Sequence, residues 1–129
     1  MTTPMATTGQ SAQTRATIDR FNAAINQGDL DVAMAETTDD VLFENTSPFP
    51  DGERFVGKAA MRAFFQAMLD GNQTSRFDAE DMFVADDRCT VCWVYHWVDR
   101  QGNPGHIRGV DVFKVRDGLI CEKLAYVKG

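Results

Sequence analysis

The order in which secondary-structure patterns follow one another constrains the fold of this chain more than any other feature. Helical periodicity ends near Asp70, and the rest of the chain alternates apolar and polar residues between short turn-forming segments. This alternation predicts strands at residues 75–84, 88–98, 106–116 and 119–127. Helices followed by consecutive strands are typical of α+β proteins, whereas a parallel α/β sheet needs a long crossover between strands. We therefore expect an α+β fold.

Helical patterns occupy three segments ahead of these strands. In residues 14–27 apolar residues recur at helical spacing, and Gly28 supplies the stop. Asp29 can cap a short second helix that ends at Asp39-Asp40, and residues 58–70 carry the apolar stripe of a third. Short strands are expected at residues 41–45 and 54–56, on either side of a turn-rich segment.

Composition places the chain among globular proteins of one domain. It has 129 residues, of which 43% are hydrophobic and 25% charged. Residues 1–13 are rich in Thr, Ala, Ser and Gln without an apolar centre, so we expect a flexible tail rather than a secretory signal. The domain itself would span residues 14–129. No apolar stretch approaches the roughly 18 residues of a membrane span.

Charge and cysteine content narrow the partners and the compartment. The formal net charge of -6 argues against nucleic acid or an anionic membrane as a partner. The three cysteines are odd in number and lie in strand patterns, which fits a reducing cytoplasm. Cys89 and Cys92 stand three residues apart in a strand, so they should point to opposite faces. We therefore expect a cytoplasmic protein without a metal site.

Asp111 is the first candidate for a functional residue. In the strand at residues 106–116 it falls on the face that carries Ile107, Phe113 and Val115, the apolar face that should point inward. A carboxylate there must be paired, hydrogen-bonded or protonated, because burying a bare charge is costly. Such a group is a site candidate, but a structural ion pair would produce the same pattern. Both interpretations stay open.

Four local segments carry a resemblance to a known family. They are residues 21–31, 39–45, 57–65 (Gly-Lys-Ala-Ala-Met-Arg-Ala-Phe-Phe) and 110–122, which contain the turn Arg-Asp-Gly-Leu-Ile. The chain resembles the SnoaL-like branch of the nuclear transport factor 2-like superfamily, which includes ketosteroid isomerase, limonene-epoxide hydrolase, scytalone dehydratase and polyketide cyclases. The resemblance implies three helices packed into a strongly curved mixed or antiparallel sheet, a cone-shaped α+β barrel. One such fold hosts many chemistries.

The match to ketosteroid isomerase holds at one catalytic position. The position of that enzyme's base resembles Asn45, and an amide cannot take a substrate proton. The position of its oxyanion-hole tyrosine resembles Phe21, which has no donor, and its neutral carboxylic acid resembles Asp111. Of the residues that position water in limonene-epoxide hydrolase, only the asparagine is matched, by Asn45. Both mechanisms are therefore disfavoured.

The inward faces that the resemblance implies give a mostly aromatic hollow. Its polar groups, the candidate catalytic residues, would be Asp111, Asn45, Tyr95 and Lys123. Its apolar wall, the candidate substrate-binding set, would be Phe21, Phe43, Phe55, Phe64, Met68, Trp93, Trp97 and Phe113. In the alternative interpretation the aromatic residues fill the core, Tyr95 has its hydroxyl bonded there, and Asn45 is a satisfied turn-end side chain.

The orientation of Lys123 depends on the turn at Asp117-Gly118. A two-residue turn would put Leu124 opposite Asp111, and a three-residue turn with a glycine bulge would put Lys123 there. The resemblance favours Lys123 inward. Lys123 would then neutralise Asp111 and favour its charged form, whereas Leu124 would favour the neutral acid.

The strand at residues 88–98 is apolar on both faces, which indicates that a second subunit covers the outer one. We expect a homodimer with a pocket for a small hydrophobic organic molecule and no cofactor. If it is an enzyme, acid–base chemistry would make it an isomerase, cyclase, dehydratase or hydrolase. The competing hypothesis is a binding or carrier module that uses the hollow without catalysis, and a third is a structural dimer with a filled cone.

Overall fold

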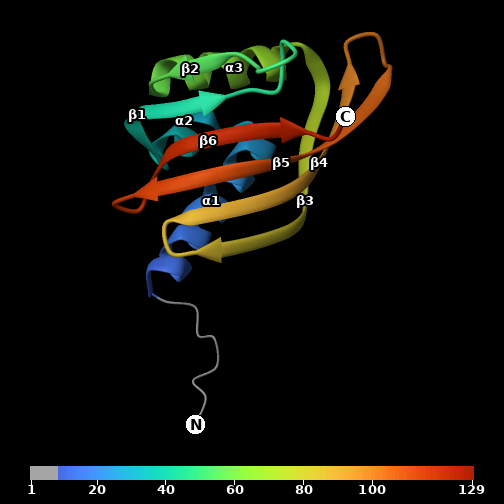
Figure 1. The fold of residues 1–129 in the computed structure, drawn as a ribbon. Coiled ribbons are helices and arrows are strands. Elements are labelled where there is room, and N and C mark those ends of the chain that lie inside the picture. Colours follow the sequence, from blue (N-terminus) through green and yellow to red (C-terminus); the bar gives the residue numbers. More distant parts are fainter. Residues whose placement is uncertain (1–8) are drawn as a thin grey trace.

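A computed structural model describes residues 9–129 (Figure 1). The helices are α1 (Gly9–Gln27), α2 (Leu30–Ala35) and α3 (Lys58–Asp70). The strands are β1 (Thr37–Glu44), β2 (Arg54–Val56), β3 (Asn72–Ala85), β4 (Arg88–Asp99), β5 (Pro104–Arg116) and β6 (Leu119–Val127). All helices thus precede the run of long strands from β3 to β6, as the order of patterns along the chain predicted.

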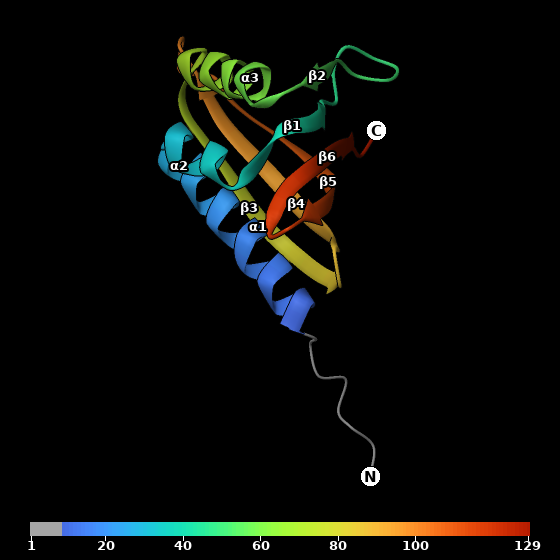
Figure 2. The same ribbon diagram turned by 90° about the vertical axis from the view of Figure 1, so that its left-hand side faces the viewer.

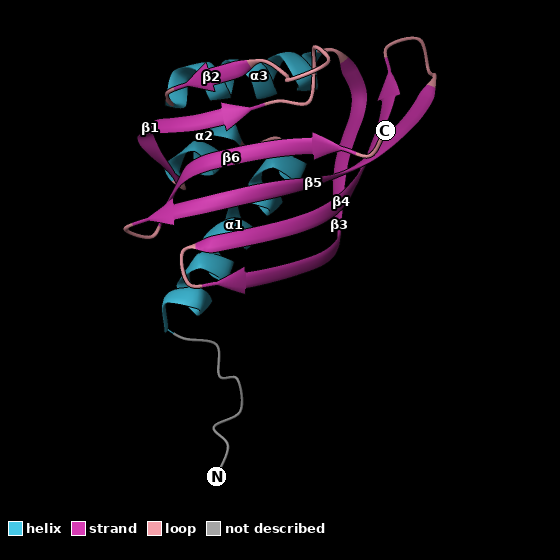
Figure 3. Ribbon diagram, viewed as in Figure 1, coloured by secondary structure: helices cyan, strands magenta, loops and turns pink. Residues whose placement is uncertain are grey.

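The strands form one six-stranded mixed sheet in the order β2-β1-β6-β5-β4-β3 (Figure 3). Neighbouring strands are antiparallel, except that β1 and β6 are parallel. The sheet curves strongly, and the helices lie along one side of it (Figure 2). Within residues 9–129, β2 and β3 are the free edges, so the barrel is not closed. The predicted α+β class with three helices on a curved mixed sheet is confirmed.

Helix α1 begins earlier than apolar periodicity predicted. It starts at Gly9, so residues 9–13 of the predicted tail are helical, and residues 1–8 lie outside the described part of the chain. The Ser11 hydroxyl accepts a hydrogen bond from the Asp86 amide at 2.8 Å, and the Thr14 hydroxyl donates to the Asp86 carbonyl at 2.6 Å. The expected start was wrong because buried hydroxyl groups, rather than apolar side chains, dock this turn of the helix.

The boundary between the second helix and the first strand also differs from expectation. Helix α2 is capped by Asp29, whose side chain accepts a hydrogen bond from the Val32 amide at 3.2 Å, as predicted. It ends at Ala35, however, and β1 begins at Thr37 rather than at residue 41. The pair Asp39-Asp40 therefore lies in the strand, because buried Thr37 and Thr38 have already taken the chain into the sheet.

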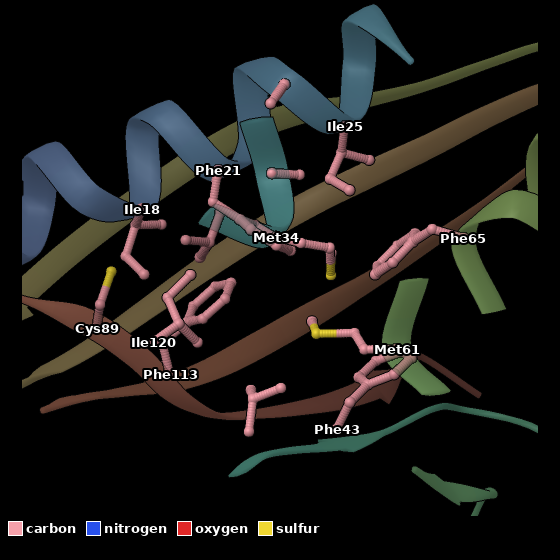
Figure 4. Packing of buried hydrophobic residues seen from close by; sticks show 14 of the residues in the cluster. Ile18, Phe21, Ile25, Met34, Phe43, Met61, Phe65, Cys89, Phe113 and Ile120 are labelled. Carbon is pink, nitrogen blue, oxygen red and sulfur yellow. The ribbon is translucent and has the colours of Figure 1, made fainter. Parts of the chain in front are cut away.

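The core lies between the helices and the inner face of the sheet (Figure 4). The ring of Phe21 on α1 meets Phe65 on α3 and Phe113 on β5 edge to face, with centroids 6.2 Å apart in both cases. Burying a phenylalanine contributes roughly 1.5–3 kcal/mol, and each edge-to-face pair adds about 1 kcal/mol. These rings fix the helices on the sheet and form the surroundings of the candidate site.

Candidate functional site

Asp111 on β5 and Lys123 on β6 form a buried ion pair. Lys123 Nζ lies 3.3 Å from Asp111 Oδ1, and the two side chains are only 7% and 6% exposed. Every other ion pair described within residues 9–129 involves at least one well-exposed side chain. An isolated charge in such a place would be costly, so each partner makes the burial of the other possible.

A bulge in the β5–β6 hairpin brings Lys123 to the inner face. The turn itself has two residues, Asp117 and Gly118, with φ of 53° and 78°, as the tight hairpin turn requires. The pairing then shifts between Lys114 and Val115, where β6 contributes an extra residue. One inserted residue exchanges the inward and outward faces of everything beyond it.

Lys123 consequently shares the inward face with Asp111, and Leu124 does not. We expected Lys123 directly opposite Asp111. That position is wrong, because Ala125 stands opposite Asp111 and Lys123 pairs with Phe113, two residues further along β5. The two charged groups therefore meet along the diagonal between neighbouring strands. Each of the two alternatives was partly right. The turn has two residues, as the first supposed, and a bulge brings Lys123 to the inner face, as the second supposed, but this bulge lies in β6 beyond the turn.

Aromatic rings surround the Lys123 ammonium. Nζ lies 4.7 Å from the ring centroid of Phe43, 5.7 Å from that of Phe65 and 5.9 Å from that of Phe113. Cation–π contacts of this kind contribute about 0.5–2 kcal/mol, more where water is excluded. One carboxylate and three rings thus hold the ammonium in place.

Asp111 also faces a cavity of about 350 Å³ that lies between α1 and the inner face of β3, β4 and β5. The cavity wall includes Phe21 and Ile25 from α1, Val91 and Trp93 from β4, and the ion pair itself. Nine of the sixteen residues that line the cavity are apolar, and the five polar ones other than Asp111 and Lys123 lie on α1 and β3. Apolar walls with some polar groups are usual for small-molecule sites. Within residues 9–129, Asp111 receives its hydrogen bond from Lys123 at Oδ1, which leaves Oδ2 to accept one from a guest.

A second cavity of about 180 Å³ lies beside α3 and the ends of β1 and β6. Its wall shares Phe65, Phe77, Trp93 and Lys123 with the larger cavity, so the two are neighbours. Lys123 stands at the wall between them.

Asn45 and Tyr95 line the smaller cavity, away from Asp111. Tyr95 lies four residues along β4 from Val91, the partner of Asp111, which is roughly 13 Å at the usual rise of a strand. The Tyr95 hydroxyl is 3.0 Å from the Ser75 hydroxyl and 3.3 Å from the Asn72 amide nitrogen, and burial raises the pKa of this tyrosine. The structure therefore brings together Asp111 and Lys123, two of the four candidate catalytic residues. The Tyr95 hydroxyl already has hydrogen-bond partners of its own.

The predicted apolar wall divides into two groups. Residues that line one or both cavities are Phe21, Phe43, Phe64, Met68 and Trp93. Residues that line neither of these two cavities are Phe55, Trp97 and Phe113. Phe113 is fully buried, Phe55 stacks on Phe43 with centroids 5.6 Å apart, and Trp97 stacks on Tyr95 at 5.3 Å. This second group packs the core that holds the wall in place.

Several wall residues of the larger cavity were missed from the sequence. They are Ile25, Phe65, Phe77, Met82 and Val91. Phe65 carried a signal, because it belongs to the apolar stripe of α3. Phe77 and Met82 carried no such signal. They are an odd number of residues apart in a strand, so strict alternation would put their side chains on opposite faces. A bulge in β3 between Ala79 and Asp81 restores them to the same side.

Metal and redox chemistry receive no support from the cysteines. Cys89 lies buried against the core, whereas Cys92 is on the opposite face and partly exposed, as strand geometry predicted. Within residues 9–129, no group of three or more His, Cys, Asp or Glu side chains is placed to hold a metal ion. In the same part of the chain, no helix has the length and apolar character needed to cross a membrane.

Solved structures from other organisms share this fold. An NTF2-like protein of unknown function from Mesorhizobium loti is 36% identical, with 93% of this chain and 94% of that chain covered and a TM-score of 0.79. The Δ5-3-ketosteroid isomerase of a Mycobacterium species is 26% identical, with 88% and 92% covered and a TM-score of 0.77. A Mycobacterium tuberculosis protein solved in complex with estradiol-17β-hemisuccinate is 25% identical, with 88% and 92% covered and a TM-score of 0.79.

Comparison with sequence families gives the same assignment. No curated protein sequence matches the chain significantly. The family model of the SnoaL-like domain matches residues 18–123, which include α2, α3, every strand up to β5 and both members of the ion pair. The chain therefore belongs to the SnoaL-like family, within the NTF2-like fold.

Proposed function

We propose that this protein binds a small, flat, apolar organic molecule in the larger cavity, with Asp111 and Lys123 as its polar anchor. The observation that carries this proposal is a buried carboxylate on the cavity wall whose Oδ1 is bound by Lys123 and whose Oδ2 has no hydrogen-bond donor among residues 9–129. The estradiol-17β-hemisuccinate in complex with the relative from Mycobacterium tuberculosis contains a flat, apolar ring system of this kind, although that molecule also carries a carboxylate.

The same pair could catalyse a proton transfer without a cofactor. Asp111 Oδ2 would take a proton from a carbon next to a carbonyl group of the bound molecule, and the electron pair would move onto the carbonyl oxygen. The Lys123 ammonium, held near the carboxylate, would stabilise that enolate. Return of the proton to another carbon would complete an isomerisation, and loss of a β-hydroxyl group as water would complete a dehydration.

A binding or carrier role is the second candidate, and two residues favour it. Asn45 carries an amide at the position matching the base of ketosteroid isomerase, and Phe21 carries no hydroxyl at the position matching its tyrosine. The amide nitrogen of Asn45 donates to Ser47 at 3.3 Å, so its described contact is structural. Binding without turnover would leave Asp111 as a ligand acceptor only.

Two measurements test these proposals. The fluorescent probe 1-aminoanthracene, whose amine can donate to Asp111 Oδ2, should bind the wild type. Asp111→Asn should weaken it at least tenfold, since a hydrogen bond to a charged group contributes about 1.5–3 kcal/mol. Asp51→Asn, the same change in an exposed loop, is the matched control and should leave the affinity unchanged. Absence of binding to the wild type would refute the proposed site.

Hydrogen exchange separates catalysis from carriage. In D₂O, catalysis predicts that the protein accelerates exchange of the α-protons of 2-tetralone, a flat apolar ketone, and that Asp111→Asn abolishes the acceleration. NMR follows the exchange directly. Bound 2-tetralone with no acceleration would leave the carrier role.

We further propose that the outer sheet face forms a homodimer. In the part of the chain that the structure describes, no helix lies over this side of β4, β5 and β6 (Figure 2). It carries the partly exposed apolar side chains of Val94, Val110 and Leu124, and Tyr126 is 55% exposed. An apolar sheet face of this kind is a usual site of subunit contact.

A further inference from the structure

The larger cavity reaches the protein surface between α1 and β3. Its wall runs from the buried pair Asp111 and Lys123 to the exposed residues Asp19 and Ala23 on α1 and Ala79 on β3. The smaller cavity reaches the surface elsewhere, beside Ala125 and the 38%-exposed Ile107. The cavity that leads to the ion pair thus has an opening of its own.

Two anchors hold α1 against the sheet on either side of this opening. Near the end of α1, the Asn26 amide nitrogen donates to the Phe77 carbonyl at 2.8 Å, and its oxygen accepts from the Phe77 amide at 2.8 Å. Near the start of α1, hydroxyl groups bind the backbone of Asp86. Between these anchors the small side chains of Ala23 and Ala79 leave the gap unfilled.

The polar side chains at the rim of the opening differ in whether they are already bound to neighbouring groups. Arg76 is engaged by Asp78, and the Asn26 amide is used at both ends by Phe77. Within residues 9–129 the Asp19 carboxylate takes part in none of the ion pairs. A free carboxylate accepts hydrogen bonds from hydroxyl or ammonium groups and repels another carboxylate.

We infer that ligands enter the cavity between α1 and β3, and that they carry a hydroxyl- or ammonium-bearing end that remains at the rim beside Asp19. This inference rests on the proposed function, because it needs the larger cavity to be the binding site. The ligand class is then an apolar ring system with a neutral or cationic polar end, oriented with its rings toward the ion pair.

Substitutions that block each opening separately test which opening the ligand uses to enter. Ala23→Trp and Ala79→Trp fill the opening between α1 and β3, Ile107→Trp fills that of the smaller cavity, and Ala63→Trp adds the same side chain on the exposed face of α3. Stopped-flow fluorescence of 1-aminoanthracene should show association at least tenfold slower in Ala23→Trp and Ala79→Trp. The other two variants should bind at the wild-type rate, and circular dichroism would confirm that all four are folded.

One outcome would overturn the inference while leaving the binding site intact. That outcome is association at the wild-type rate in both Ala23→Trp and Ala79→Trp, with or without slow association in Ile107→Trp. If either of these two variants does not fold, the other alone decides. Failure of the wild type to bind the probe would overturn the inference and the proposed function together.

Matched probes test the rim. The neutral 1-pyrenebutanol should bind more tightly than 1-pyrenebutyrate, which differs in the end group. Asp19→Asn should reduce the ratio of the two affinities about two- to threefold, the size expected for an exposed charge. Asp51→Asn should leave the ratio unchanged. Tighter binding of the butyrate, or no response to Asp19→Asn, would show that the polar end does not rest there.

Discussion

Replacing Lys123 by Met tests how much the fold depends on the buried ion pair. Met keeps most of the apolar stem of lysine among the aromatic rings but leaves the Asp111 carboxylate, whose side chain is 6% exposed, without its partner. Removing one member of a buried pair costs about 3–5 kcal/mol. Because Asp111 borders a cavity that can admit water, we expect the lower end of this range, about 3 kcal/mol.

The double variant Asp111→Leu with Lys123→Met provides the control. Apolar replacement of both partners removes the unpaired charge, and such replacements are often neutral or stabilising. We therefore expect the double variant to regain most of the stability that Lys123→Met loses. This non-additivity would identify the charge, rather than lost packing, as the cause.

Urea denaturation and thermal melting followed by circular dichroism would measure both variants. A loss of about 3 kcal/mol corresponds to a fall in Tm of roughly 10 °C for a domain of this size. A loss below about 1 kcal/mol in Lys123→Met would match an exposed ion pair and refute the buried geometry. A double variant less stable than Lys123→Met would show that the cost comes from packing.

Three further outcomes are expected. Tyr95→Phe should cost about 1 kcal/mol, measured by urea denaturation, because it removes one buried hydrogen-bonded hydroxyl, and it should not alter the affinity for 1-aminoanthracene; a large loss of affinity would mean that the two cavities act as one site. Burial raises the pKa of Cys89 to about 12, so its thiol stays protonated at pH 8, and mass spectrometry should find iodoacetamide on Cys92 but not on Cys89 until urea unfolds the protein. Light scattering at micromolar concentration should give a mass near twice 14.4 kDa, and a monomer would refute the proposed dimer.

Much of the architecture was predictable from local patterns. Helices before strands gave the α+β class, and strand periodicity put Asp111 on the inner face, where it is 4% exposed. The start of α1 was not predictable from periodicity, because its first buried contacts use the hydroxyls of Ser11 and Thr14.

The candidate site depended on details that residue patterns do not record. Lys123 faces inward only because a bulge shifts β6 after the Asp117-Gly118 turn, and the family resemblance supplied that side correctly. A second bulge, in β3, hid the common face of Phe77 and Met82. The opening between α1 and β3 depends on how far a helix lies from an edge strand. That distance is a property of tertiary packing.

A crystal structure of the protein with 1-aminoanthracene would test the central proposal most directly. We predict the ring system in the larger cavity against Phe21 and Trp93, with the amine about 3 Å from Asp111 Oδ2 and Lys123 still bound to Oδ1. A probe bound elsewhere, or a larger cavity that stays empty at saturating probe, would contradict the role assigned to Asp111.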